Sequence, residues 1–105
     1  MEETPAGQGF EEIIKQFQQP GDPDYHNNMG SAHRLRGDTD AAIREFREAI
    51  RLRPDDVAFH CNLASVWAEK GEHQEAIREY ENGLRLNPND YHTDFDLGNL
   101  LRKMG

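Results

Sequence analysis

Apolar residues recur along most of the chain at the spacing of amphipathic helices. One stripe includes Tyr25 and Met29, and the next includes Ile43 and Phe46. Side chains three or four residues apart share one face of an α-helix, so each stripe predicts a helix with one buried side. Applied to the whole chain, this spacing predicts helices over 10–19, 24–36, 40–52, 57–70, 74–86 and 91–104.

The same two-helix pattern returns after 34 residues. Gly37 and Gly71 are separated by 34 residues, and so are Pro54 and Pro88. Aligned without a gap, the two periods share 12 of 34 positions. The glycines follow the first helix of each pair, where a left-handed end favours a residue without a Cβ, and the prolines end the second helix. A fixed period of this length is typical of an α-helical solenoid.

The period also predicts how the chain is organised. We expect a tail with a short helix over 1–22 and a repeat domain over 23–105, made of repeats over 23–56 and 57–90 and a capping helix or partial third repeat over 91–105. Two alternatives remain open for the C-terminal segment. It is either a solvating end helix or the start of a repeat in a longer protein, which would leave Leu97, Leu100 and Leu101 partly uncovered.

The expected N-terminal helix carries an apolar stripe of its own, at Phe10, Ile13, Ile14 and Phe17. Another surface must cover this stripe. The N-terminal helix is therefore either a degenerate second helix that packs on helix 24–36 of the same chain, or a mobile helix that docks in the groove of its own or another copy.

These features resemble the tetratricopeptide repeat family, whose 34-residue unit has small, aromatic and proline residues at fixed places. The matching residues of the first repeat are Gly30, Ala42, Phe46, Ala49 and Pro54. Those of the second are Ala64, Ala76, Tyr80, Gly83 and Pro88. The resemblance implies an all-α fold, a right-handed α-solenoid of antiparallel helix pairs. At the fourth position of each unit the family's usual large aromatic is replaced by His26, His60 and Asp94, and we expect this to loosen packing between the paired helices.

The resemblance also implies a binding surface, because the first helices of such repeats line a concave groove. The groove positions of this chain are Asn27, Asn28, Ser31, Arg34, Cys61, Asn62, Ser65, Glu69, Phe95, Asp96, Asn99 and Arg102, with Leu35, His92 and Lys103 beside them. Asn28 and Asn62 are equivalent, and their amides can pair with the backbone of an extended peptide. Of the residues that form the family's clamp for C-terminal carboxylates, only Asn62 is present, so we expect acidic chaperone tails to bind weakly or not at all.

Composition narrows the possible partners. Among 105 residues, 12 are Lys or Arg and 20 are Asp or Glu, which gives a net charge of −8. Binding to nucleic acid or to an anionic membrane needs clustered cations, so neither is expected as a partner. The single cysteine cannot form an internal disulfide, and the sequence has neither a leader-like start nor an apolar run of about 20 residues. We expect a cytoplasmic protein.

No pattern of catalytic or cofactor-binding residues is present, so we expect a non-enzymatic protein without a cofactor. The glycines stand singly at helix ends and form no phosphate-binding loop. His26 and His60 are expected to pack or hydrogen-bond rather than to bind zinc, and no metal site is predicted. Cys61 is expected to be a half-buried or groove-lining residue without an activating base.

Charged residues on the expected helix 40–52 alternate in sign. Arg44, Arg47 and Arg51 are interleaved with Glu45 and Glu48, which predicts ion pairs within the helix and a solvated outer face.

The sequence therefore predicts an adaptor or scaffold that binds a peptide or protein segment in its groove. Two alternatives remain: a self-assembly module that forms homo-oligomers through its terminal helices, or a non-catalytic, substrate-recruiting fragment of a larger enzyme.

Overall fold

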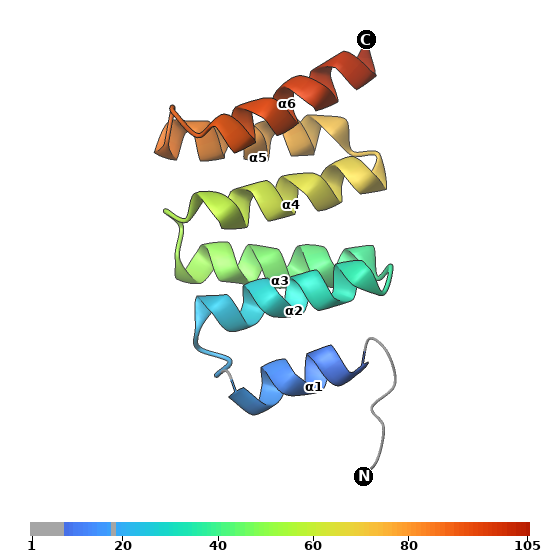
Figure 1. Ribbon diagram of the computed structural model, residues 1–105, viewed down its shortest axis with the longest axis vertical. Coiled ribbons are helices and arrows are strands. Elements are labelled where there is room, and N and C mark those ends of the chain that lie inside the picture. Colours follow the sequence, from blue (N-terminus) through green and yellow to red (C-terminus); the bar gives the residue numbers. More distant parts are fainter. Residues whose placement is uncertain (1–7, 18) are drawn as a thin grey trace. The chain divides into compact units, whose positions relative to one another are not determined.

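The computed structural model of the chain describes residues 8–17 and 19–105, and these residues form helices and short connections without a strand. The helices are α1 (Gln8–Phe17), α2 (Pro23–Leu35), α3 (Thr39–Leu52), α4 (Val57–Lys70), α5 (His73–Leu86) and α6 (Tyr91–Met104) (Figure 1). The predicted bounds of α2 to α6 are confirmed to within one residue, whereas α1 begins and ends two residues earlier than expected. The predicted all-α fold is confirmed.

Local signals set these helix ends. Gly37 and Gly71 have φ angles of 80° and 90°, the left-handed conformation that the sequence predicts for the residue after a first helix. The side chains of Asp22, Asp56 and Asp90 each accept a hydrogen bond from a backbone N–H two residues later. Such N-caps satisfy backbone donors that the first turn of a helix leaves unpaired.

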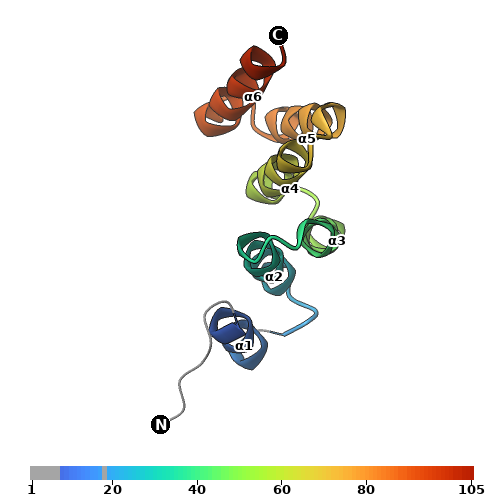
Figure 2. The same ribbon diagram turned by 90° about the vertical axis from the view of Figure 1, so that its right-hand side faces the viewer.

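The chain divides into two compact units, Met1–Arg53 and Pro54–Gly105. Within the first unit, α2 packs beside α3, and within the second, α4 packs beside α5 (Figure 2). α1 contacts α2 in the first unit, and α6 contacts α5 in the second. Each unit is therefore a helix pair with one additional helix.

In the first unit, α2 approaches α3 closely at a glycine. A Cβ atom added to Gly30 would lie 2.6 Å from Cε1 of Phe46, so only glycine allows the Phe46 ring this position. Phe46 is fully buried, and so are Ala42 and Ala49 of the same helix. The small residue and the aromatic ring that the repeat pattern singles out thus form the centre of this helix pair.

α1 covers α2 of its own chain. Ile14, 4% exposed, forms a buried cluster with Met29 and Ala32, and Glu11 forms an ion pair with Arg36. Of the two arrangements that the sequence leaves open, this is the one in which the N-terminal helix packs on the next helix of the same chain. Ile13 points away and is 54% exposed. The side chains of the two phenylalanines of the stripe, at positions 10 and 17, lie outside the described residues.

The core of the second unit joins all three of its helices. Cys61 and Ala64 of α4, Ala76 and Tyr80 of α5, and Leu100 of α6 form one buried cluster. The longer-protein alternative would leave three leucines of α6 partly uncovered. Of these, Leu100 is buried, Leu97 packs at the edge of the cluster, and Leu101 is 49% exposed.

None of the helices formed by residues 8–17 and 19–105 has the length and apolar character needed to cross a bilayer.

Candidate functional site: the first-helix surface

On the first unit, the expected groove residues lie along α2. Asn27, Asn28 and Ser31 are half-buried, and Arg34 is exposed. The two asparagines and the arginine also make interactions with other residues of the chain. The first unit therefore presents a polar strip along α2.

On the second unit, the structure brings three predicted residues together in one pocket. The pocket has a volume of about 250 Å³ and is lined by Ser65 and Ala68 of α4, Tyr80 of α5, and Asp96, Asn99, Leu100 and Lys103 of α6. Ser65, Asp96 and Asn99 are groove positions on two different first helices. Lys103 stands beside them in the predicted groove.

This pocket combines hydrogen-bond donors, acceptors and an apolar floor. The Ser65 hydroxyl lies 3.3 Å from the Tyr80 hydroxyl, and Asp96 lies 3.3 Å from the ring of His92. Arg102 donates a hydrogen bond to the Asn99 side-chain oxygen, which leaves the Asn99 NH₂ group to donate elsewhere. An extended peptide backbone needs donors and acceptors in such a mixture.

Cys61, expected on this surface, is instead withdrawn from it. Cys61 is 9% exposed, and its Sγ lies 2.9 Å from Oγ1 of Thr93, a fully buried residue of α6. Burial raises the pKa of the Cys61 thiol above its usual value of 9.0, which keeps it protonated and unreactive at neutral pH. We therefore leave Cys61 out of the binding surface.

The other predicted residues of the second unit lie outside the pocket. Asn62 is half-buried on α4, and Glu69 and Arg102 are exposed. Phe95 is 64% exposed and does not line the pocket. Sequence reasoning in turn missed Tyr80 as a pocket wall. The sequence does contain a signal for this role, because a tyrosine, which carries a hydroxyl, stands at position 80 where the first repeat has Phe46.

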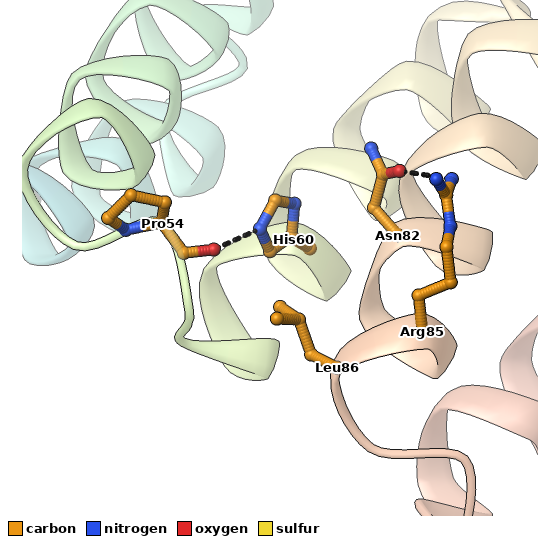
Figure 3. A pocket seen from close by; sticks show the side chains of 5 residues that line it. All are labelled: Pro54, His60, Asn82, Arg85 and Leu86. Atoms are coloured by element: carbon orange, nitrogen blue, oxygen red, sulfur yellow. Dashed lines mark hydrogen bonds between the residues drawn. The ribbon is translucent and has the colours of Figure 1, made fainter.

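His60 is fixed by two hydrogen-bond acceptors. Its Nδ1 lies 2.8 Å from a carboxylate oxygen of Glu79 on α5, and its Nε2 lies 2.9 Å from the backbone oxygen of Pro54 (Figure 3). A neutral imidazole has only one N–H, so it cannot donate to both. The hydrogen bond to Glu79 raises the pKa of His60 above 6.5, and the contact with the Pro54 oxygen acts in the same direction. His60 also lines an open pocket of about 270 Å³ with Pro54, Asn82, Arg85 and Leu86.

His26 repeats this arrangement in the first unit. Its Nδ1 lies 3.1 Å from Glu45 of α3, and its Nε2 lies 2.6 Å from the backbone oxygen of Pro20. The hydrogen-bonded histidine expected at this position is confirmed, and the expected loosening is corrected, because the imidazole connects the two helices. Glu45 was expected to pair with an arginine of its own helix. It pairs instead with His26, whereas Glu48 does pair with Arg51.

The described residues contain no group of three or more His, Cys, Asp or Glu side chains placed to hold a metal ion.

Comparison with known proteins places the chain among repeat proteins. Residues 27–91 match the sequence profile described as Tetratricopeptide repeat. No curated protein sequence matches the chain. Two crystal structures of MamA are similar, with TM-scores of 0.84 and 0.81 and sequence identities of 24% and 23% over 94% and 91% of this chain. The match spans 59% and 54% of those two MamA chains, a little over half of their length. At such identity the likeness shows a shared fold.

Proposed function

The chain belongs to the tetratricopeptide repeat family, whose members are generally non-catalytic modules for protein interaction, and we propose that it is an adaptor that holds an extended segment of a partner protein. The observation that carries this proposal is the pocket of the second unit. Residues chosen by repeat position alone, Ser65, Asp96 and Asn99, line it together.

The chemistry of the pocket favours an uncharged stretch of peptide. Ser65, Asn99 and Lys103 supply donors, and Asp96 supplies an acceptor. Asp96 and Lys103 bring opposite charges to the same pocket, so the pocket as a whole attracts neither an acidic nor a basic group strongly, and we propose a segment internal to the partner chain. Leu100 and Ala68 give the pocket an apolar wall for a small side chain.

The test is selection from a library of displayed random peptides, followed by calorimetry with the selected peptide. The Ser65→Ala and Asn99→Ala double variant should lose about 1–3 kcal/mol of binding free energy, the cost of unmade hydrogen bonds at a buried interface. Arg78→Ala, on the exposed side of α5, is the matched control and should bind as the native chain does. Equal affinities for the native chain and the double variant would refute the pocket as the site.

Self-association is a second proposal, and it rests on the terminal helices. Ile13 of α1 and Phe95 of α6 are 54% and 64% exposed, so each end of the chain offers a large apolar side chain for a contact between copies. Light scattering over a hundredfold range of concentration tests it. A mass that stays at 12.1 kDa throughout would remove this proposal.

A further inference from the structure

The open pocket beside His60 lies within the second unit, and the residues that line it recur in the first unit. Each of them has an equivalent 34 residues earlier in the chain. The equivalents of Pro54, His60, Asn82, Arg85 and Leu86 are Pro20, His26, Glu48, Arg51 and Leu52. Four of these five residue types are the same in both units, and the one difference is asparagine in place of glutamate. A single exchange therefore separates the two sites.

In the first unit, Glu48 supplies a carboxylate to the arginine. Nε of Arg51 donates hydrogen bonds to both carboxylate oxygens of Glu48, each at 3.0 Å, and Nη2 of Arg51 donates to one of them. These hydrogen bonds raise the pKa of Arg51 and lower the pKa of Glu48. The arginine at this repeat position therefore binds a carboxylate, and in the first unit the chain itself provides it.

In the second unit, the arginine meets an uncharged amide instead. Arg85 donates a hydrogen bond to the side-chain oxygen of Asn82 (Figure 3), and the side-chain nitrogen of Asn82 donates to Glu79 at 3.4 Å. Among the described residues, no carboxylate forms an ion pair with Arg85. A guanidinium group has five N–H donors, so Arg85 keeps both its positive charge and most of its donors for a ligand.

The other charged groups near the pocket decide which kind of anion fits. The two ring nitrogens of His60 are occupied by Glu79 and by the Pro54 oxygen, so the imidazole has no N–H left for a ligand and Glu79 balances its charge. Glu81, one turn before Arg85 on α5, lines a neighbouring pocket rather than this one. The chain as a whole carries a charge of −8. A doubly charged phosphate is therefore disfavoured, and a single carboxylate matches the one uncompensated cation.

The pocket also has apolar walls and more space than a carboxylate needs. Figure 3 shows Pro54 and His60 on one side of the pocket and Asn82 and Arg85 on the other. The side chain of Leu86 is another wall, and this residue is 43% exposed. The volume of about 270 Å³ leaves room for several methylene groups beside the charged group.

We propose that this pocket binds one carboxylate group carried on a short apolar stem. Arg85 donates to the carboxylate oxygens, and the second N–H of the Asn82 amide lies beside it as a further donor. A glutamate side chain of another protein and a free aliphatic acid both present this group. The site shares no lining residue with the pocket around Ser65 and Asn99, so the two proposals can fail independently.

NMR titrations of the ¹⁵N-labelled full chain at constant ionic strength test the chemistry. The first probe is the capped tripeptide Ala-Glu-Ala, and its matched control is capped Ala-Gln-Ala, which has the same shape without the charge. The signals followed are the side-chain NH₂ of Asn82 and the Nε–H of Arg85. The glutamate peptide should bind about fivefold more tightly than the glutamine peptide, the upper range for an ion pair with an exposed side chain.

Butanoate is the second probe, because it carries the same carboxylate without a peptide backbone. Tighter binding of Ala-Glu-Ala than of butanoate would support a glutamate side chain as the source of the group. Equal affinities would support a free aliphatic acid. Tighter binding of inorganic phosphate than of either carboxylate would contradict the proposal.

Variants of the chain show whether the contact is the proposed one. Asn82→Glu provides an internal carboxylate, as in the first unit, and should remove the preference for the glutamate peptide. The first unit holds Glu45 and Glu48 at the equivalent places, so the fold accepts two glutamates there. Arg85→Gln should remove the preference as well. The matched control is Arg51→Gln, which changes the net charge equally at the equivalent position of the first unit and should leave the affinity unchanged.

The opposite results would overturn the proposal. Equal affinity of the native chain for the two tripeptides would do so, and so would a preference that survives in Asn82→Glu or Arg85→Gln. An equal loss in Arg51→Gln would show that only the net charge of the chain matters. Circular dichroism should show native helix content in every variant, because both arginines are exposed and Asn82 is half-buried.

Discussion

The two full repeats place an aromatic ring over a small residue, but they do so with different chemistry. Phe46 is completely buried over Gly30, and its ring has no polar atom. Tyr80 is 5% exposed, packs with Ala64, and directs its hydroxyl toward Ser65. The packing need is the same in both units, and the second unit adds a polar group at the wall of its pocket. The ring therefore meets the packing requirement of both units, and we propose the Tyr80 hydroxyl as a contact for a ligand of the second unit.

The largest effect is expected at the purely apolar position. Phe46→Ala removes a ring with no exposed surface and leaves a cavity between α2 and α3. Urea denaturation should show a loss of about 3–5 kcal/mol in the free energy of unfolding, the usual cost of such a truncation. A loss below about 1 kcal/mol would mean that the ring is not the centre of the first unit.

A smaller effect is expected from adding a single methyl group beneath that ring. Gly30→Ala places a Cβ 2.6 Å from Phe46, so the ring must shift, and we expect a loss of about 1–3 kcal/mol. Gly83→Ala is the matched control, because its Cβ would meet Thr93 at an ordinary 3.5 Å. With ordinary contacts and a helical site, it should leave stability unchanged or raise it by up to about 1 kcal/mol. Similar losses in both variants would contradict the close approach at Gly30.

The pH dependence of stability tests the link through His60. Because the pKa of His60 is raised above 6.5 by Glu79, the stability contributed by this pair is fully present below pH 6.5. It is lost as the pH rises through the raised value. His60→Phe should remove this part of the pH dependence, with a difference of about 1 kcal/mol, the usual net contribution of a single hydrogen bond.

Urea denaturation of both proteins provides the measurement, at half-unit steps from about pH 5.5, below the ordinary histidine pKa, upward through neutrality. Glu79→Gln should flatten the profile in the same way, because it removes the carboxylate that holds the proton on His60. Parallel profiles for the native chain and His60→Phe would show that the pair contributes nothing.

The smallest effect on stability is expected where the two repeats differ. Tyr80→Phe makes the second unit resemble the first and removes one hydrogen bond of 3.3 Å to Ser65. We expect a loss of about 0.5–1 kcal/mol in unfolding free energy. The affinity for a peptide bound in the pocket should change as well, because the hydroxyl belongs to the pocket wall. An unchanged affinity would place the ligand elsewhere.

Local signals explain why so much of the fold could be predicted. Gly37, Gly71, Pro54 and Pro88 set the helix ends through backbone preferences that need no distant partner. The repeat then places one aromatic ring against one small residue in each unit. The helix ends and this ring contact can therefore be read from a single repeat of 34 residues. The structure confirms the predicted helices almost residue by residue.

Side-chain partners from other helices could not be predicted in this way. Cys61 has the spacing of a surface residue, yet it turns toward Thr93 of α6, a contact 32 residues away. Glu45 has arginines on its own helix, yet it bonds to His26 of α2. In both cases the partner of the side chain depends on how closely two helices approach each other. The periodicity of the sequence alone does not specify this distance.

Chemical-shift mapping by NMR tests the central claim most directly. A chain labelled with ¹⁵N would be titrated with a peptide selected from the random library, and every backbone amide followed. We predict that the largest shifts fall around the pocket of the second unit, at Ser65, Asp96, Asn99 and Lys103. Shifts confined to the exposed faces of α3 and α5, or a library that yields no binding peptide, would contradict it.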